Sequence, residues 1–453
     1  MDKAAEELQY RKMTETPVAK LIGTLAIPTI LTMLVSNIYN LVDTAFVGLW
    51  GNSASGAVGV VFGFMAILQA VGYMFGQGAG SLAARKLGAR DIRAASVISS
   101  TGFFSALIIG AVLEVVCLFL LRPLVFFLGS TATIAPYAET YIFYILLAAP
   151  FTIAGFTLNI ILRYEGKAFY GMIGLVTGAV LNIGGDAVLM LGFDLGITGA
   201  GISTAVSQVI SFVILLIPFL RGKTESRLSI RSARFSPRLE ADLITTGLPS
   251  LLRQGLNSIN TVLLNNHAAV YGDAAVAAMS IVARIGFFVF SVALGVGQGF
   301  QPVCSFNYGA KKYSRVRRGY FVTLIMAEVL MVIINVIVML NTNTFVRLFR
   351  DDDLVCEIAA GALILQCIGQ MVLPVCMVTE MTMQSSGKKV GAVLLSAFRS
   401  GAFFIPALII LAYFFGLAGI QWAQPAAFIF SLLPSVLFAS YYFRHLPKEE
   451  HAS

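Results

Sequence analysis

Carboxylate and amide side chains interrupt two strongly apolar stretches of the chain. Asp43 lies near the end of the apolar run 21–47, and Asn182 and Asp186 lie four residues apart in the run 169–192. Side chains four residues apart share one face of a helix. A charge at the centre of a membrane-spanning helix costs about 2.5–3.5 kcal/mol, so such residues indicate function. Because oxygen ligands suit hard cations, this pattern predicts a site for a proton or Na⁺.

Further polar residues in neighbouring apolar stretches extend this candidate site. Thr204 and Gln208 are four apart in the run 197–220, and Asn159 interrupts the run 136–162. We therefore assign the cation- or proton-coupling site to Asp43, Asn182, Asp186, Thr204 and Asn159, and expect no metal beyond Na⁺ at the first four. Asn37, Asn40 and Gln208 are candidates for lining a cavity or contacting a substrate.

Weaker candidates lie in the second half of the chain and on the first apolar run. Arg284 and Arg399 either pair with Glu380 or face a substrate cavity, and His267 is either a hydrogen-bonded packing residue or a proton relay. Pro28 removes a backbone donor and can kink the helix that carries Asp43. We hypothesise that a bend there moves the carboxylate when its protonation or ligation changes.

The composition defines the kind of chain that holds these residues. Of 453 residues, 58% are hydrophobic and 12% are charged, against about 25% charged in soluble domains. This excludes a soluble enzyme, a nucleic-acid-binding domain and a disordered chain. The five cysteines show no metal-ligand spacing, so they are interpreted as small buried hydrophobes, and we expect no cofactor.

The apolar runs predict an all-α integral membrane protein with twelve transmembrane helices, because a helix needs about 20 apolar residues to span a bilayer. Continuous runs favour helices over barrel strands, in which apolar residues would alternate. The predicted helices are 21–47, 54–82, 94–121, 136–162, 169–192, 197–220, 244–271, 274–305, 317–341, 357–384, 388–414 and 419–443.

The chain repeats itself at an offset of 221 residues. Pro28 matches Pro249, Gly51 matches Gly272, and Gly166-Lys167 matches Gly387-Lys388. Six helices per repeat is an even number, so both copies enter the membrane from the same side as parallel lobes. We predict an N-terminal segment 1–20, lobes at 21–220 and 244–443, a linker at 221–243 and a tail at 444–453. Paired lobes indicate an alternating-access transporter.

Basic residues in the short loops predict the orientation. The loops on the side of the termini hold 25 Lys and Arg residues, and the opposite side holds 3. Because Lys and Arg concentrate in cytoplasmic loops, both termini are predicted in the cytoplasm. We expect a multi-pass monomer in the plasma (cytoplasmic) membrane.

The second repeat has no carboxylate at the positions that match Asp43 and Asp186. At the offset of 221, Asp43 matches Leu264, Asn182 matches Phe403 and Asp186 matches Ala407. A role in packing the repeat would place carboxylates in both lobes, so the asymmetry favours a coupling site in the N-terminal lobe. The alternative is that these residues are polar contacts between helices, satisfied by their neighbours.

Two stretches of sequence resemble those of the MATE (multidrug and toxic compound extrusion) transporters: Ile38 to Gly48, and Leu181-Asn182-Ile183-Gly184-Gly185-Asp186. The resemblance covers essentially the whole chain and is nearest to the DinF-like branch. It implies a cation site at Asp43, Asn182, Asp186 and Thr204, with Asn159 as a neighbour. It also implies export of cationic or amphiphilic drug-like molecules in exchange for Na⁺ or H⁺, across the lipid bilayer and without nucleic acid.

Other classes of membrane protein remain as alternatives. A lipid-linked precursor flippase shares a related two-lobe plan, but usually resembles fourteen-helix proteins with a basic cavity. A membrane-embedded aspartyl protease also uses two aspartates, but Ile183 stands where its motif needs glycine. An ion channel would not need the asymmetry between the lobes. These considerations favour an antiporter over an enzyme.

Overall fold

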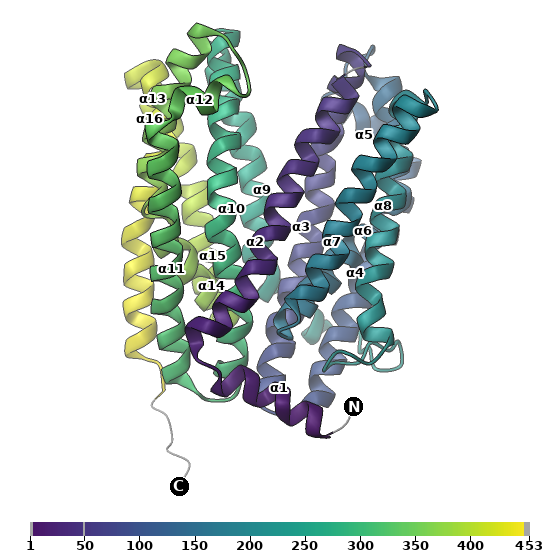
Figure 1. Cartoon of the computed structure of the whole chain (residues 1–453), viewed down its shortest axis with the longest axis vertical. Helices are drawn as coiled ribbons and strands as arrows, with labels where there is room; N and C mark the ends of the chain where they lie inside the picture. Colours follow the sequence, from purple (N-terminus) through teal and green to yellow (C-terminus); the bar gives the residue numbers. More distant parts are fainter. Residues whose placement is uncertain (1–2, 49, 448–453) are drawn as a thin grey trace. The chain divides into compact units, whose positions relative to one another are not determined.

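The computed structural model describes residues 3–48 and 50–447, and every regular element in these residues is helical (Figure 1). In the first half the elements are α1 (Lys3–Glu15), α2 (Val18–Gly48), α3 (Asn52–Gly88), α4 (Ile92–Phe119), α5 (Leu121–Phe127), α6 (Ala135–Tyr164), α7 (Ala168–Asp186), the π-helix η1 (Ala187–Gly192) and α8 (Gly196–Leu220). In the second half they are α9 (Pro237–Ala269), α10 (Asp273–Gly309), α11 (Tyr313–Leu340), α12 (Thr342–Arg347), α13 (Asp353–Gln370), α14 (Leu373–Ser385), α15 (Lys389–Ala397), the π-helix η2 (Phe398–Ala402) and α16 (Phe404–Arg444).

The predicted all-helical membrane fold is confirmed. Ten segments of the described chain are long and apolar enough to cross a membrane, and one of them, Lys389–Arg444, spans 56 residues. Gly416 has non-helical angles (φ 60, ψ −133) inside α16, so that segment contains two passes. Helix α9 carries Arg253 and several amides, which lower its hydropathy below that of the other spans. With α9 and the divided segment, the described helices make twelve passes.

The chain packs into two compact units, and two long helices pass from one unit into the other. Helix α2 begins in unit 2 and ends in unit 1, and α9 begins in unit 1 and ends in unit 2. Unit 1 comprises Met1–Met13 and Leu31–Leu251, and unit 2 comprises Thr14–Ile30 and Leu252–Ser453. The divisions fall two residues after Pro28 in α2 and two residues after Pro249 in α9. Proline breaks the backbone hydrogen-bond ladder, which explains why these helices change packing partners there.

The backbone confirms the internal repeat. Glycines with positive φ recur at the offset of 221: Gly51 (96°) with Gly272 (93°), and Gly166 (76°) with Gly387 (78°). The non-glycine pair Arg90 (62°) and Lys311 (59°) recurs at the same offset. Left-handed backbone is uncommon outside glycine. Its repetition at matched positions therefore shows that both units use the same turns.

Helix α6 is the centre of unit 1 and packs against α3, α4 and α8. Tyr141, Leu146 and Ile153 of α6 are fully buried. Glycines bring the neighbouring helices close: a Cβ at Gly72 would lie 2.8 Å from Phe156, and one at Gly178 would lie 2.8 Å from Ser211. In lipid no hydrophobic driving force brings helices together, so their association depends on the close van der Waals packing that small residues allow.

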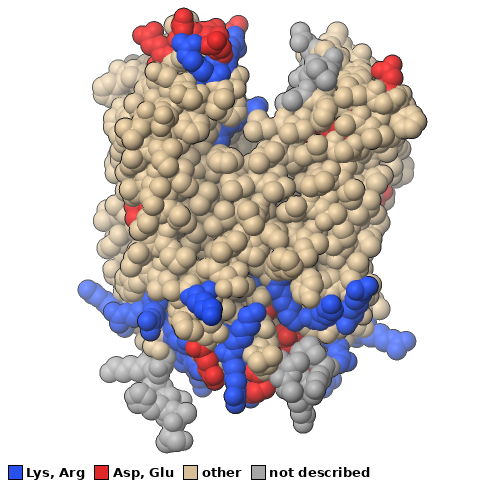
Figure 2. Space-filling model, in the orientation of Figure 1, with Lys and Arg blue, Asp and Glu red and all other residues tan. Residues whose placement is uncertain are grey.

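Charged residues gather at the ends of both units. On the face shown in Figure 2, Lys and Arg (blue) of unit 1 concentrate at its end with the α3–α4 turn, and those of unit 2 concentrate at its end with the α10–α11 turn. In each unit a broad band of other residues (tan) separates this end from the opposite one. Such a band is what a bilayer requires, because charges are costly in its core.

The segment 221–236, which we call the linker strap, is tied to unit 1. Hydroxyls on α4 accept backbone N–H bonds from it: Ser96 from Arg227 (3.0 Å) and Thr101 from Arg234 (2.9 Å). The buried Glu165 carboxylate accepts the backbone N–H groups of Glu225 (2.8 Å) and Ser226 (3.0 Å). The strap is therefore an ordered part of unit 1 in the described chain.

Candidate functional site

Three helices of unit 1 supply the buried polar cluster. Asp43 projects from α2, Asn182 and Asp186 project from one face of α7, and Thr204 projects from α8. Their exposed fractions are 6%, 1%, 0% and 1%. We call these four residues the acidic cluster. The structure thus brings together the four residues that the sequence suggests as cation ligands.

The close contact between α7 and α8 depends on a small residue beside the cluster. A Cβ at Gly185 would lie 2.4 Å from the Ser203 hydroxyl oxygen, so only glycine fits without moving Ser203. The Ser203 hydroxyl donates to the backbone carbonyl of Asn182 at 2.9 Å. This bond fixes the part of α7 from which the Asn182 side chain projects.

Asn182 connects the carboxylate of α7 to helix α8. With its amide oxygen towards α8, the side chain accepts from the Thr204 hydroxyl (3.1 Å) and backbone N–H (3.2 Å), and its NH₂ donates to Oδ2 of Asp186 (3.1 Å). We assign this orientation because it satisfies both ends of the amide. Asn182 therefore positions Asp186 relative to Thr204.

The two carboxyl groups lie close enough to interact directly, and Asp43 also interacts with Tyr141 of α6. Among the described residues, Oδ1 of Asp43 and Oδ1 of Asp186 are buried without a hydrogen-bond partner. Buried polar atoms are almost always satisfied, so unsatisfied ones need an explanation. Two adjoining carboxylates repel each other, and a shared proton or a bound cation removes that repulsion.

Two buried tyrosines beside the acidic cluster were not predicted. Tyr39 lies one turn before Asp43 on α2, and Tyr141 lies on α6, which contributes no carboxylate. The spacing of Tyr39 and Asp43 offered a signal in the sequence. Tyr141 offered none, because only the packing of α6 against its neighbours brings it to the carboxylates.

A small polar cavity adjoins the cluster in unit 1. Its volume is about 10 Å³, and its polar lining residues are Gln69, Thr152, Thr204 and Gln208. A cavity of this size holds about one water molecule. Gln208 is thus placed beside Thr204, and Thr204 belongs both to this cavity and to the acidic cluster.

Of the remaining candidates, Asn159 lies apart from the acidic cluster. The Asn159 amide packs against Gly171, eleven residues before Asn182, which is about 16 Å along a helix. Asn37 is half-buried on α2, and the side chain of Asn40 falls outside the described residues. Pro28 lies inside α2, in the part of that helix that belongs to unit 2.

The candidates of unit 2 take separate places. Arg399 contacts Glu380 at 3.2 Å, while Arg284 is exposed and makes no described ion pair. The second partner of Glu380 is Arg253, at 2.9 Å, a pairing that the sequence did not predict. His267 Nδ1 bonds the backbone carbonyl of Leu263 at 2.8 Å, one turn earlier on α9.

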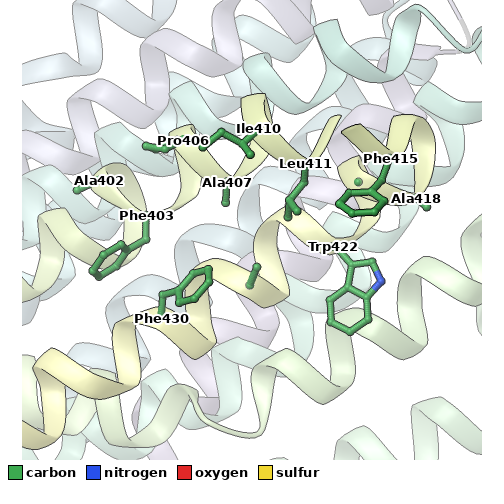
Figure 3. Close-up of a pocket in the computed structure, with 12 residues that line it drawn as sticks. Ala402, Phe403, Pro406, Ala407, Ile410, Leu411, Phe415, Ala418, Trp422 and Phe430 are labelled. Carbon is green, nitrogen blue, oxygen red and sulfur yellow. The ribbon is translucent and has the colours of Figure 1, made fainter. Parts of the chain in front are cut away.

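Unit 2 also has an apolar pocket of about 650 Å³ (Figure 3). Its lining residues come from η2 and α16, including Phe403, Leu411, Phe415 and Trp422. Within the described chain, no Asp, Glu, Lys, Arg or His lines it. The pocket is therefore apolar and does not include the charged residues of the same unit.

The fold and the buried polar cluster define a polytopic, all-helical membrane protein built on an internal repeat. The family model described as MatE matches residues 28–188 and 249–413, two segments that begin 221 residues apart. The chain belongs to the MatE family.

Relatives and solved structures agree with this family. The chain is 27% identical to the multidrug export protein MepA of Staphylococcus saprophyticus over 92% of each chain. It is also 27% identical to MepA of Staphylococcus aureus strain N315 over the same shares. A solved structure of the outward-facing conformation of a multidrug resistance MATE family transporter of the MOP superfamily matches with a TM-score of 0.91. That match is 24% identical and covers 96% of this chain and 98% of the other.

Proposed function

We propose that this protein is a secondary active multidrug efflux antiporter, not an enzyme. It exports cationic or amphiphilic small molecules in exchange for H⁺ or Na⁺ by alternating access. The observation that carries the proposal is the pair Asp43 and Asp186, buried together with an unsatisfied oxygen on each. Relatives named as multidrug export proteins support the substrate class.

The acidic cluster couples the two fluxes because its charge changes when it is occupied. Without a cation, Asp43 and Asp186 repel each other in a buried site. With a proton or Na⁺, the repulsion is removed. Thr204 and Asn182 complete the oxygen ligands of Na⁺ once the Asn182 amide, which donates to Asp186 in the structure, turns its oxygen towards the cation. A ligand shifts a conformational equilibrium only by its difference in affinity for the two states. The acidic cluster supplies that difference, and bending of α2 at Pro28, as hypothesised from the sequence, transmits it along the helix.

The proposed orientation places both termini in the cytoplasm and the chain in the plasma (cytoplasmic) membrane as a monomer. The bias of 25 to 3 in the basic residues of the loops supports this orientation. The exported molecule then leaves on the side opposite to the basic loops. The driving cation enters from that side.

Resistance to cationic drugs in a transporter-deficient host tests the function. We expect Asp43→Asn and Asp186→Asn each to abolish resistance at unchanged expression, because an amide cannot bind a proton or balance Na⁺. Asp194→Asn is the matched control, because Asp194 is exposed in a turn at φ 54°, which asparagine also adopts. Full resistance in both cluster variants would contradict the proposal.

A further inference from the structure

Unit 2 holds a buried cluster of three charged side chains, which we call the arginine triad. Glu380 of α14 contacts Arg253 of α9 at 2.9 Å and Arg399 of η2 at 3.2 Å. The exposed fractions of Glu380, Arg253 and Arg399 are 1%, 6% and 5%. One carboxylate therefore serves two guanidinium groups inside a membrane-spanning unit, and the triad carries one excess positive charge.

The hydrogen bonding of the triad is incomplete. Among the described residues, Nη1 of Arg399 and Oε2 of Glu380 are buried without a hydrogen-bond partner, although Nη2 of Arg399 lies 3.2 Å from that oxygen. Nearby, Asn260 donates to the Ser400 carbonyl at 2.6 Å, and its Oδ1 is also unsatisfied. A buried guanidinium is normally paired in a fork geometry with an oxyanion. Arg399 thus has one buried donor without an acceptor, and an anionic ligand would supply that acceptor.

Each helix of the triad is irregular close to its charged residue. Arg253 follows Pro249 by four residues, and Glu380 follows the interruption between α13 and α14 at 371–372. Arg399 lies inside the π-helix η2. Interruptions and π-helical turns occur frequently at functional sites, where they let a helix re-aim a side chain. The triad is therefore built on segments that can adjust to admit a ligand.

The repeat shows that the triad is not needed to form the scaffold. At the offset of 221, the positions of Arg253, Glu380 and Arg399 match Thr32, Asn159 and Gly178 in the first repeat. Those residues carry no charge, yet the two repeats share their turns. A buried charged triad is also weak evidence for stability, because desolvation offsets the attraction within it.

We propose that the arginine triad is a binding site for the carboxylate group of an exported organic acid or zwitterion. In the empty site Glu380 occupies the guanidinium groups of Arg253 and Arg399. A ligand carboxylate takes the free donor of Arg399 and competes with Glu380. This deepens the proposed function, on which it rests, by adding carboxylate-bearing molecules to the substrates. The carboxylate belongs either to a small acid in solution or to an amphiphile, and both give the same contact.

Equilibrium binding of the fluorescent amphiphile 1-pyrenebutyrate to the purified full chain in detergent tests this site. We expect the natural protein to bind the acid at least about tenfold more tightly than its uncharged methyl ester, because the ester lacks the charge. Displacement by millimolar acetate would support the site as one for any carboxylate. Resistance to acetate would support it as one for the amphiphile. Equal binding of acid and ester would overturn it.

Substitutions of opposite sign separate binding from folding. We expect Arg399→Gln to weaken binding of the acid about tenfold, Arg399→Lys to weaken it less, and Glu380→Gln to tighten it, because the competing carboxylate is removed. Arg444→Gln, at the exposed end of α16, is the matched control and leaves binding unchanged. A triad that only stabilises the fold would not give opposite signs, so weaker binding in Glu380→Gln would contradict the proposal.

The binding assay needs no ion gradient. Failure of the carboxylate site would leave the cation coupling of unit 1 intact. Failure of coupled transport would likewise leave the binding result standing. The two proposals are therefore tested independently.

Discussion

The acidic cluster of unit 1 and the arginine triad of unit 2 are opposite in charge. Asp43 and Asp186 give unit 1 two buried carboxylates, whereas Arg253, Glu380 and Arg399 give unit 2 an excess guanidinium. Each cluster is replaced by uncharged residues at the matching positions of the other repeat. A duplicated scaffold has thus kept its turns while its two copies acquired different polar interiors.

The two clusters also differ in what would satisfy them. The unsatisfied atoms of the acidic cluster are oxygens that accept, so a proton or a cation completes it. In the triad, a donor of Arg399 and an oxygen of Glu380 are both unsatisfied, and an anion supplies the acceptor that the guanidinium lacks. Because the acidic cluster can bind a cation and the arginine triad can bind an anion, one chain can bind its driving cation and the anionic group of a substrate at separate places.

The largest predicted effect concerns the stability of the triad. Glu380→Ala leaves two buried guanidinium groups without their carboxylate, and we expect it to destabilise the chain by about 3–5 kcal/mol. The triple variant Arg253→Met, Glu380→Leu, Arg399→Met removes all three charges, so we expect it to be neutral or about 1–4 kcal/mol more stable. Thermal unfolding in detergent measures both. Equal destabilisation by the single and triple variants would contradict this account.

The acidic cluster should behave as one unit in transport. We expect Asp43→Asn, Asp186→Asn and the double variant to lower drug export to a similar extent, about tenfold or more each, because residues that act together are not additive. Export from cells at matched expression measures the three variants against the natural chain. A double variant whose loss equals the product of the two single losses would show that the carboxylates act separately.

A pair of adjacent glycines tests the packing that supports the acidic cluster. In Gly185→Ala the new methyl group meets the Ser203 hydroxyl, and we expect a cost of about 1–3 kcal/mol. Gly184→Ala is the control, because a Cβ there meets nothing within 4 Å. We expect the control to be neutral or to stabilise by up to about 1 kcal/mol through helix propensity. Thermal unfolding of the two variants gives the comparison, and equal destabilisation would contradict it.

The smallest predicted effect is a pH dependence of local stability at Glu165. Unlike the carboxylates of the acidic cluster, that of Glu165 is hydrogen-bonded through both oxygens. Burial raises the pKa of Glu165, partly offset by its hydrogen bonds to Ser226 and by the Lys167 charge. Relative to the unfolded chain, folding therefore favours the neutral form of this carboxyl. Its contribution to stability is complete below the unfolded pKa of about 4.3 and is lost as the pH rises through the raised pKa.

Hydrogen exchange of the linker strap measures that contribution. After correction for the intrinsic rate, we expect protection of residues 224–229 to fall as the pH rises from mildly acidic to neutral. Burial also raises the pKa of Glu225, against the opposing Lys167 charge, so its effect has the same sign. Glu165→Gln should flatten the dependence. Protection that increases with pH would show the reverse linkage.

Much of the fold could be predicted because hydropathy is a local property of the sequence. The predicted helices 136–162 and 169–192 correspond to Ala135–Tyr164 and to the joined segment Ala168–Gly192. The start of α9 was predicted at 244 instead of 237. Its first turns, directly after the linker strap, are polar and therefore do not read as part of an apolar span. The predicted helix 357–384 is divided in the structure at 371–372, directly before Pro374 at the second position of α14, because hydropathy alone does not mark where a proline breaks a span.

Part of the acidic cluster could also be predicted, because Asn182 and Asp186 share a helix face through their spacing. The partners that come from other helices could not be deduced from spacing. Tyr141 reaches the carboxylates only because α6 packs at the centre of unit 1, and Arg253 meets Glu380 across 127 positions of sequence. Lateral packing of helices depends on side-chain shape, which periodicity does not record.

The most direct test of the central claim is efflux of a fluorescent organic cation from proteoliposomes under separately imposed Na⁺ and pH gradients. We predict that one of the two gradients drives efflux in the natural chain and in Asp194→Asn, and that neither gradient drives it in Asp43→Asn or Asp186→Asn. Gradient-driven efflux that persists in both cluster variants would show that the acidic cluster does not couple the ion to export.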